Sequence, residues 1–284
     1  MERFGRFGKD NGVDRMRRFL RRTSEAYGPK TNVIPPGPPL GAAQFQGAEG
    51  LTAPQGGALP TLSPTGGQDM AVSFFLAIDT MPAAATLQEV IRCMSTAAGL
   101  GGWQIQLNGT TQSLRWQTRD TGVLQAPVDL VTVLPTQEWM YCNFSFDNSG
   151  GAANISIFIQ GVTSGVLVNI GAGSSFCGPV HTNPLQMGTG AAFGLQGRLS
   201  RVGVWLPVGV SPPDVSYLYN GGVGRTGAEV VASGPPPVWG DPTDLRGYWD
   251  LNEQTGAAVW PDTTGFHDAA ASGTIVSVNA PPTY

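Results

Sequence analysis

Short runs of alternating apolar and polar residues, separated by turn residues, dominate this chain from residue 70 onward. In residues 155–159 (ISIFI) Ile occupies every second position, the period of a β-strand with one buried face. The 40 Gly and 23 Pro among 284 residues require many turns and exclude a fold built mainly of long helices. The chain is therefore expected to be all-β.

Seven segments meet the strand criterion, and their number and shortness predict a two-sheet antiparallel sandwich. They are residues 71–78, 103–107, 114–118, 139–146, 154–159, 165–170 and 198–206. One short helix is expected within residues 211–222 (SPPDVSYLYNGG), because Pro lies in its first turn and Asn-Gly-Gly ends it. A chain of this length can bury one substantial core, so one main domain is expected over residues 70–284.

Charge divides the chain unevenly. Residues 1–30 hold nine of the 16 Lys and Arg residues and four of the 20 acids, a net charge of +5, and the remaining residues carry −9. The first part would attract an anionic or carboxylate-bearing partner, whereas the second would repel a polyanion. The two parts are therefore expected to have different partners.

The basic arm, residues 1–30, starts with a repeated Arg-Phe-Gly triplet and continues as an amphipathic helix ending at Gly28-Pro29. Such a helix can lie on anionic lipid or nucleic acid, or pack its apolar side into a protein groove, and the protein partner is favoured. Residues 31–69, rich in Pro and Gly, are expected to form an extended linker. The arm residues expected to make the contact are Arg3, Phe4, Arg6, Phe7, Arg15, Met16, Arg18, Leu20, Arg21 and Arg22.

Three cysteines, Cys93, Cys142 and Cys177, stand far apart with no zinc-type cluster. They are expected to be buried thiols of a protein made in a reducing compartment. No stretch is long and apolar enough to span a bilayer, and the first residues lack the apolar core of a secretory signal. Synthesis in a cytoplasm, without membrane contact, is the resulting expectation.

Three groups of residues carry a family resemblance. They are residues 187–205, with MGTG at 187–190 and LQGRLSRVGVW at 195–205, the following helix to residue 222, and the pair GYWDLNEQTG (247–256) and DTTGFHD (262–268). In order and spacing they resemble the closing strand and helix, the Y-W-x-L-x-E-x-x-G element and the D-x-x-G element of laminin-G-like and concanavalin A-like jelly rolls. The Y-W-x-L-x-E element often opens such domains. Here it lies late, so residues 225–284 are expected to be a C-terminal extension on the same sandwich, or the strand order to be circularly permuted.

The resemblance implies a binding or structural role, because this fold occurs in sugar-binding modules and in structural proteins of tailed phages. With the basic arm, it predicts a virion accessory protein, either a minor tail protein or a capsid-decorating protein. Residues 1–69 would anchor it to neighbouring subunits after synthesis in the host cytoplasm, and it would be a homo-oligomer or present in many copies. Nucleic acid is not expected as a partner. The alternative is a lectin-like module that recognises a cell-surface glycan, and both roles can coexist in one adhesion protein.

No enzyme is expected. Glycosidases need two carboxylates about 5–10 Å apart. The nearest candidates are Asp241 and Asp244 in a Pro-rich loop, and Asp250 and Glu253, whose odd spacing puts them on opposite faces of a strand. The two histidines, His181 and His267, are expected in turns or at the surface, without a Gly-x-Ser-x-Gly elbow or a phosphate-binding loop.

Two binding sites remain as hypotheses. The resemblance implies a calcium ion, with Asp262 and Asp268 as first candidates and Asp147 as second, although Asp also favours turns without any metal. No other cofactor is expected. Of the seven Trp, Trp239 and Trp260 lie in Pro-flanked loops and are the candidates for stacking on a glycan. The other five lie in strand patterns and are predicted to be core residues.

Overall fold

The structure is a computed structural model in which Pro39–Tyr284 form one compact unit. It describes residues 41–64, 68–95, 101–120, 122–130, 132–147, 154–161, 167–170, 183–189, 194–209, 212–232 and 244–279. The predicted basic arm and the first part of the predicted linker lie outside the described residues, as do Cys177, His181 and Trp239.

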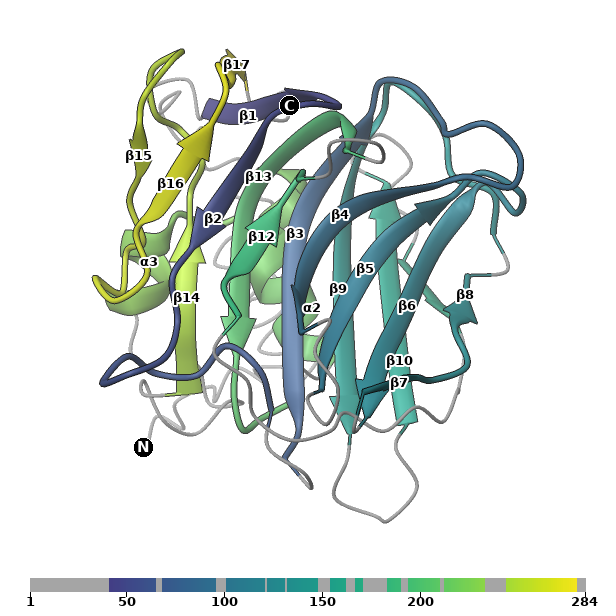
Figure 1. Cartoon of the computed structure of the whole chain (residues 1–284), viewed down its shortest axis with the longest axis horizontal. Helices are drawn as coiled ribbons and strands as arrows, with labels where there is room; N and C mark the ends of the chain where they lie inside the picture. Colours follow the sequence, from purple (N-terminus) through teal and green to yellow (C-terminus); the bar gives the residue numbers. More distant parts are fainter. Residues whose placement is uncertain are drawn as a thin grey trace, which may run out of the picture. The chain divides into compact units, whose positions relative to one another are not determined.

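Two antiparallel sheets face each other in this unit (Figure 1). Within the described residues, the first, sheet A, has eight strands in the order β11-β10-β9-β3-β13-β1-β17, with β14 also paired to β13. Its strands are β1 (Gly41–Gln46), β3 (Met70–Ile78), β9 (Trp139–Asp147), β10 (Asn154–Gly161), β11 (Leu167–Ile170), β13 (Gln196–Trp205), β14 (Leu245–Trp249) and β17 (Val276–Asn279).

Sheet B has nine strands among the same described ranges, in the order β15-β16-β2-β12-β4-β5-β6-β7, with β8 paired to β6. The predicted all-β, two-sheet sandwich is confirmed, and each of the seven predicted segments contains a strand. The strands of sheet B are β2 (Gly50–Ala53), β4 (Leu87–Met94), β5 (Gly102–Asn108), β6 (Ser113–Asp120), β7 (Val123–Leu124), β8 (Val128–Asp129), β12 (Leu185–Met187), β15 (Val259–Trp260) and β16 (Ala269–Ser272).

Aromatic residues at alternate strand positions fill the space between the sheets. Trp103 and Trp116 of sheet B stack with ring centroids 5.7 Å apart, and Trp116 also stacks on Phe144 of sheet A at 5.8 Å. All three side chains are fully buried, so each removes a large apolar area from water. The five Trp residues predicted to be core are buried, and so are Cys93 and Cys142.

Two short helices and a 3-10 turn cover the outer face of sheet A. They are α2 (Pro212–Tyr219), η1 (Asn220–Gly222) and α3 (Gly227–Ala232), and α2 confirms the predicted helix. Tyr219 of α2 and Val230 of α3 join a second apolar cluster with Phe75 and Tyr141 of the sheet. All nine residues of β3 are therefore buried, on both faces of the sheet. No helix in the described part of the chain is long and apolar enough to cross a membrane.

Residues 41–53, predicted as part of a linker, form β1 and β2 instead. Phe45 and Leu51 are buried in the core, β1 pairs with β13, and β2 pairs with β12. The Gly, Ala and Gln content of this segment resembles that of a linker, but its apolar positions match the inward positions of two strands. The sandwich therefore begins near residue 41, and the boundary predicted at residue 70 is wrong.

The predicted C-terminal extension completes both sheets. β14 pairs with β13 in sheet A, as expected for a strand packed on the same sandwich. β17 also joins sheet A beside β1, whereas β16 pairs with β2 in sheet B. Residues 245–279 thus supply the neighbours of the two early strands, and the two chain segments depend on each other for pairing.

Candidate functional site

The outer face of sheet B carries long polar side chains on four neighbouring strands, β4, β5, β6 and β8. In β5, Trp103 and Ile105 point into the core, so Gln104 and Gln106 point outward. The paired positions on the other strands share that side of the sheet. Eight outward residues form what we call the amide face: Glu89, Arg92, Gln104, Gln106, Asn108, Arg115, Gln117 and Asp129.

Strand register aligns the amide face in two rows that run across the sheet. One row joins Glu89 of β4, Gln106 of β5, Arg115 of β6 and Asp129 of β8, each directly opposite the next. The second row joins Arg92, Gln104 and Gln117 in the same way. Directly opposed side chains on adjacent strands lie about 5 Å apart at Cβ, so each row forms a continuous polar surface.

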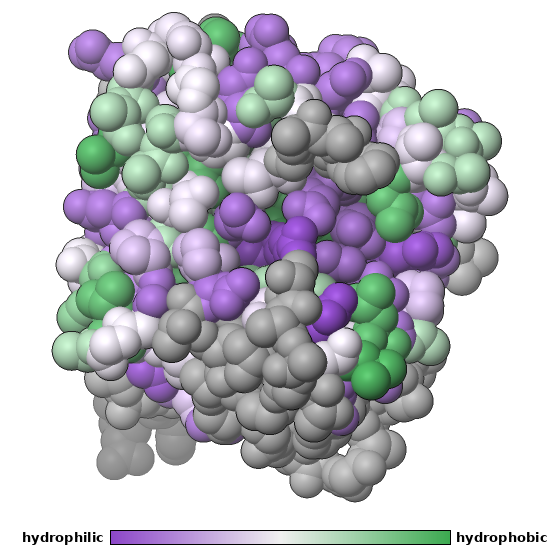
Figure 2. Space-filling view, in the orientation of Figure 1, coloured by the Kyte–Doolittle hydropathy of each residue, from purple (hydrophilic) through white to green (hydrophobic). Residues whose placement is uncertain are grey.

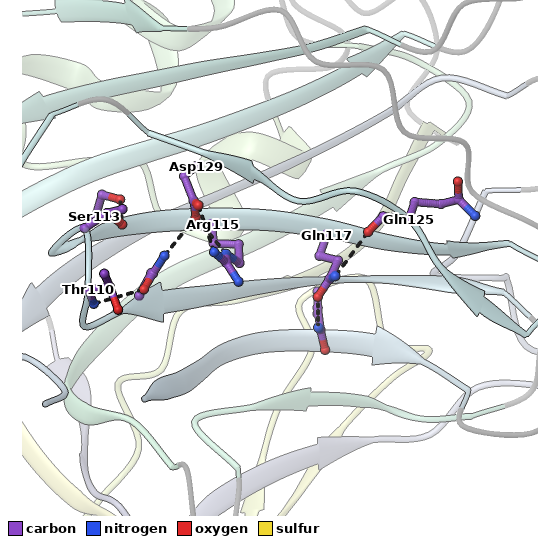
Figure 3. Close-up of polar contacts among 9 residues, drawn as sticks. Thr110, Ser113, Arg115, Gln117, Gln125 and Asp129 are labelled. Atoms are coloured by element: carbon purple, nitrogen blue, oxygen red, sulfur yellow. Dashed lines mark hydrogen bonds and ion pairs between the residues drawn. The ribbon is translucent and has the colours of Figure 1, made fainter. Parts of the chain in front are cut away.

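Arg115 and Asp129 form a bidentate ion pair at the β8 end of the first row. Arg115 donates from Nε to Oδ1 of Asp129 at 2.7 Å and from Nη2 to Oδ2 at 2.8 Å (Figure 3). Asn108 donates from Nδ2 to the same Oδ1 at 3.3 Å and accepts the backbone N–H of Thr110 at 3.0 Å. Hydrogen bonds from Arg115 hold the pKa of Asp129 below its ordinary value. The four groups fix one another's orientation.

Amide side chains continue this network along the second row. Gln104 donates from Nε2 to Oε1 of Gln117 at 3.0 Å, and Gln117 donates from Nε2 to the backbone carbonyl of Gln125 at 3.1 Å (Figure 3). Each amide is thereby locked in one orientation, because one end is already hydrogen-bonded. Gln104 is buried against its neighbours, whereas Gln117 is half-buried.

A second ion pair lies on β4. Arg92 donates from Nη1 to Oε1 of Glu89 at 3.0 Å, and the two side chains retain 22% and 16% of their exposure. Burial raises the pKa of Glu89, and Arg92 opposes that rise. The amide face as a whole therefore carries two cations that are each paired with an anion.

Two atoms of the amide face are buried without a hydrogen-bond partner among the described residues. Oε1 of Gln106 is an acceptor, and Nε of Arg92 is a donor. Gln106 is 6% exposed and lies in the middle of the first row, between Glu89 and Arg115. An unsatisfied buried acceptor costs roughly 1–3 kcal/mol, so an incoming hydroxyl group that donates to it would recover that energy.

Hydrophilic residues gather on this side of the molecule near the region where Figure 1 places β4 and β5, and apolar residues lie beside them (Figure 2). The ion pair at the edge of the amide face remains within reach of solvent, because Arg115 and Asp129 retain 20% and 27% of their side-chain exposure. A soluble ligand can therefore contact this ion pair directly.

The predicted glycan contact at Trp260 is wrong. Trp260 is fully buried in β15, belongs to the main core, and donates from Nε1 to the backbone carbonyl of Ala257 at 3.1 Å. Pro261, which is exposed, follows directly after the last residue of the strand. The other candidate, Trp239, lies outside the described residues.

Asp262, the first calcium candidate, is a structural residue in a turn. It is 4% exposed, and its Oδ1 accepts the backbone N–H groups of Tyr248 at 2.7 Å and Thr264 at 3.0 Å. Its Oδ2 accepts the Thr264 hydroxyl and the backbone N–H groups of Phe266 and His267. A carboxylate offers about four lone-pair positions, so five donors leave none for a cation.

The other calcium candidates form no metal site with Asp262. Asp268 is exposed and accepts the backbone N–H of Asp262 at 2.9 Å, while Asp147 lies in sheet A at the end of β9. Among the described residues, no group of three His, Cys, Asp or Glu side chains could hold a metal ion. The geometry thus assigns Asp262 and Asp268 to turn formation.

The two motifs that carried the resemblance hold each other in place. Tyr248 donates its backbone N–H to Asp262, and Trp249 donates from Nε1 to the backbone carbonyl of His267 at 2.9 Å. Gly265 closes the turn with φ of +80°, a conformation that favours glycine. His267, predicted at the surface, is fully buried and contacts the Pro54 carbonyl through Nδ1 at 2.8 Å.

The arrangement on sheet B does not match the paired carboxylates of a glycosidase. Glu89 and Asp129 lie on strands separated by β5 and β6, and neighbouring strands are about 4.8 Å apart. Their carboxylates are thus roughly 14 Å apart, beyond the span of about 5–10 Å that glycoside hydrolysis needs. Asp250, a candidate from the sequence, accepts the backbone N–H of Gly227 at 2.9 Å and caps α3.

Comparisons with known proteins identify the fold. No protein-family profile and no curated protein sequence matches the chain. Among solved structures, a candidate carbohydrate binding protein from Bacteroides ovatus ATCC 8483 superimposes with a TM-score of 0.56 at 13% identity. The match covers 87% of this chain and 62% of that one, so the chain spans less than two thirds of its length.

Two further structures are similar at lower scores. Ruminococcus gnavus IT-sialidase CBM40 bound to α2,3-sialyllactose has a TM-score of 0.43 at 12% identity, covering 63% of this chain and 97% of that one. Tailspike protein 2 from Escherichia coli O157:H7 bacteriophage CAB120 has a TM-score of 0.42 at 14% identity, covering 67% and 24%. The chain is an all-β sandwich of the concanavalin A-like and laminin-G-like type.

Proposed function

We propose that the protein is a non-catalytic carbohydrate-binding module that binds sugar hydroxyl groups on its amide face. The observation that carries the proposal is the set of amide and guanidinium side chains aligned by register across β4, β5, β6 and β8. An amide both donates and accepts hydrogen bonds, as a sugar hydroxyl does. The candidate carbohydrate binding protein that shares this fold also supports the proposal.

Pre-organisation favours binding at this face. Gln104, Gln117 and Asn108 are each held by a side-chain hydrogen bond within the network. Ordering a flexible side chain on binding costs about 0.5–1.5 kcal/mol. Side chains that are already ordered avoid most of that cost, so their remaining hydrogen-bonding capacity is available to a ligand.

Affinity for one sugar unit should be low, because the amide face carries no aromatic side chain on which a sugar ring could stack. About four net hydrogen bonds of ~1 kcal/mol each give ~4 kcal/mol, which corresponds to a dissociation constant on the order of 1 mM. Useful affinity then requires several binding units on one ligand or several copies of the protein. A repeating polysaccharide satisfies the first condition.

A screen of the full-length chain on immobilised neutral and acidic glycans tests the proposal, with Arg115→Ala as the site variant. Arg198→Ala is the matched control, since Arg198 forms a similar ion pair with Asp79 at 2.9 Å and has 21% side-chain exposure, but lies on sheet A. We expect Arg115→Ala to weaken binding at least tenfold and Arg198→Ala less than twofold. Failure of the wild-type chain to bind any glycan, or equal losses in both variants, would refute the proposal.

A second candidate function, as a virion accessory protein, rests on the sequence of the arm. The net charge of +5 over residues 1–30, against −9 in the remainder, favours a separate docking partner for the arm. In this proposal the arm and residues 31–40 attach the sandwich to a minor tail or capsid position, and the amide face points outward. Deletion of residues 1–30 should abolish particle incorporation while leaving the thermal unfolding of the sandwich unchanged; normal incorporation would contradict it.

A further inference from the structure

Charge pairing on the amide face determines which class of saccharide it can accept. Both cations of the amide face are already neutralised: Arg115 holds Asp129 through two hydrogen bonds, and Arg92 holds Glu89. Arg119, at the next outward position of β6, donates from Nη1 to the backbone carbonyl of Gly122 at 3.0 Å. A ligand carboxylate that bound the remaining N–H groups of either guanidinium would compete with the protein carboxylate that already neutralises it. It would also lie near two protein carboxylates, whose like charge disfavours it.

The unpartnered acceptor favours a ligand that carries hydroxyl groups. Oε1 of Gln106 lies in the middle of the first row, and no donor within the described part of the chain reaches it. A sugar hydroxyl can donate to this oxygen, whereas an ionised carboxylate or sulfate group has no hydrogen to donate. The acceptor therefore selects a hydroxyl group, and the charge pairing selects neutral saccharides over acidic ones.

We infer that the amide face binds neutral saccharides with adjacent hydroxyl groups and excludes acidic ones. The inference rests on the proposed carbohydrate-binding function and specifies its ligand class. One hydroxyl donates to Gln106, and its neighbours accept from the free N–H groups of the adjoining amides and of Arg92. Binding exchanges hydrogen bonds with water for hydrogen bonds with the protein and neutralises no net charge.

Native affinity electrophoresis of the full-length chain tests the ligand class. The neutral probes are galactomannan, xyloglucan and mixed-linkage β-glucan, and the acidic probes are polygalacturonate, alginate and polysialic acid. We expect retardation by at least one neutral polymer and none by the acidic polymers. Raising NaCl tenfold should change the affinity for the neutral polymer less than twofold, because no net charge is neutralised.

The electrophoresis results distinguish a wrong ligand class from a failure of the proposed carbohydrate binding. Retardation by the acidic polymers alone overturns the inference and leaves carbohydrate binding in place. Retardation by no polymer, together with no binding to the immobilised glycans, overturns both. Gln106→Leu should weaken binding to the neutral polymer at least fivefold; unchanged affinity also overturns the role given to Gln106.

A charge variant provides a gain-of-function test. Asp129→Asn leaves an amide that still accepts from Arg115 but removes one negative charge from the amide face. We expect the ratio of acidic to neutral polymer affinity to rise at least fivefold. Asp79→Asn is the matched control, because it removes the same charge from the Arg198 ion pair on the other sheet and should leave the ratio unchanged. A ratio that rises equally in both variants reflects global charge and overturns the inference.

Discussion

Asp262 accepts the backbone N–H of Tyr248 at 2.7 Å, and this contact joins the turn before β16 to strand β14 of the opposite sheet. Four further donors of that turn converge on the same carboxylate. Hydrogen bonds to a charged group contribute about 1.5–3 kcal/mol, and buried donors left without an acceptor add to the loss. Asp262 is therefore expected to stabilise the whole C-terminal segment.

Asp262→Ala should lower the free energy of unfolding by about 3–5 kcal/mol, measured by urea denaturation. The control is Asp268→Ala, which removes one hydrogen bond of an exposed residue and should cost about 1 kcal/mol. Calcium at millimolar concentration should not shift the melting temperature of the wild-type chain. A calcium-dependent stabilisation that Asp262→Ala abolishes would restore the metal role predicted from the sequence.

Protonation of the Asp129 carboxylate at low pH should weaken saccharide binding. Its pKa is depressed from 3.8 chiefly by hydrogen bonds from Arg115, so the ion pair is complete at higher pH and is lost as the pH falls through the lowered pKa. Affinity for a neutral polymer should fall in acid in two steps, first as Glu89 is protonated, whose pKa burial raises, and then at lower pH as Asp129 is protonated. Asp129→Asn should remove the second step, as followed by affinity electrophoresis over pH. An unchanged second step in the variant would assign the effect to another group.

Trp260 is expected to act on stability alone. Trp260→Ala removes a fully buried side chain from the core and should cost about 3–5 kcal/mol in urea denaturation. Trp260→Phe keeps most of the apolar volume and should bind glycans like the wild-type chain. Loss of glycan binding by the folded Trp260→Phe variant would show that Trp260 contributes to binding.

Local sequence pattern was sufficient to predict most strands but not where the sandwich begins. Residues 71–78 and 139–146 are rich in β-branched and aromatic residues, which fit a strand in any context. β1 contains Ala42, Ala43 and Gln44, whose strand character depends on pairing with β13 and β17, far along the chain. Such long-range pairing leaves no local signal, so the segment resembled a linker.

In the sequence, the residues of the amide face appear only as the polar positions of alternating strand patterns. The outward positions of residues 103–107 (WQIQL) and 114–118 (LRWQT) are Gln and Arg, which a strand pattern treats as ordinary solvent-facing residues. Long amide and guanidinium side chains at successive outward positions were the available signal. Whether these side chains form one surface depends on the strand register, which places Gln106 opposite both Glu89 and Arg115. The hypothesis of an exposed aromatic side chain that stacks on a sugar ring pointed instead to Trp260, which is a core residue.

The electrostatic interaction between buried Arg201 and half-buried Asp250 should produce a second pH effect. Arg201 is 2% exposed, lies over the ring of Phe75 at 5.9 Å, and has both Nη atoms buried without a hydrogen-bond partner among the residues that the structure describes. Desolvation lowers the pKa of Arg201 and raises that of Asp250, while the charge of Arg201 partly offsets the rise at Asp250. The two groups therefore reduce each other's cost of burial.

Arg201→Met should make stability more dependent on pH. Without the cation, the pKa of Asp250 in the folded chain rises further above its unfolded value. The folded state then binds more protons than the unfolded state over a wider window, and stability falls as pH rises through that window. Each unit of added pKa difference corresponds to about 1.4 kcal/mol. Urea denaturation at pH 4 and pH 7 should show a fall in Arg201→Met that exceeds the wild-type fall by about 1 kcal/mol or more.

The double variant Arg201→Met/Asp250→Asn isolates the carboxylate. The amide that replaces the carboxylate of Asp250 can still accept the Gly227 N–H through its side-chain oxygen but cannot ionise, so the added pH dependence should disappear. At pH 4 the single variant should match or exceed the wild-type stability, because Met replaces a buried guanidinium whose two Nη atoms lack acceptors among the described residues. Parallel pH profiles for the wild-type chain and Arg201→Met would show that the charge of Arg201 does not act on Asp250.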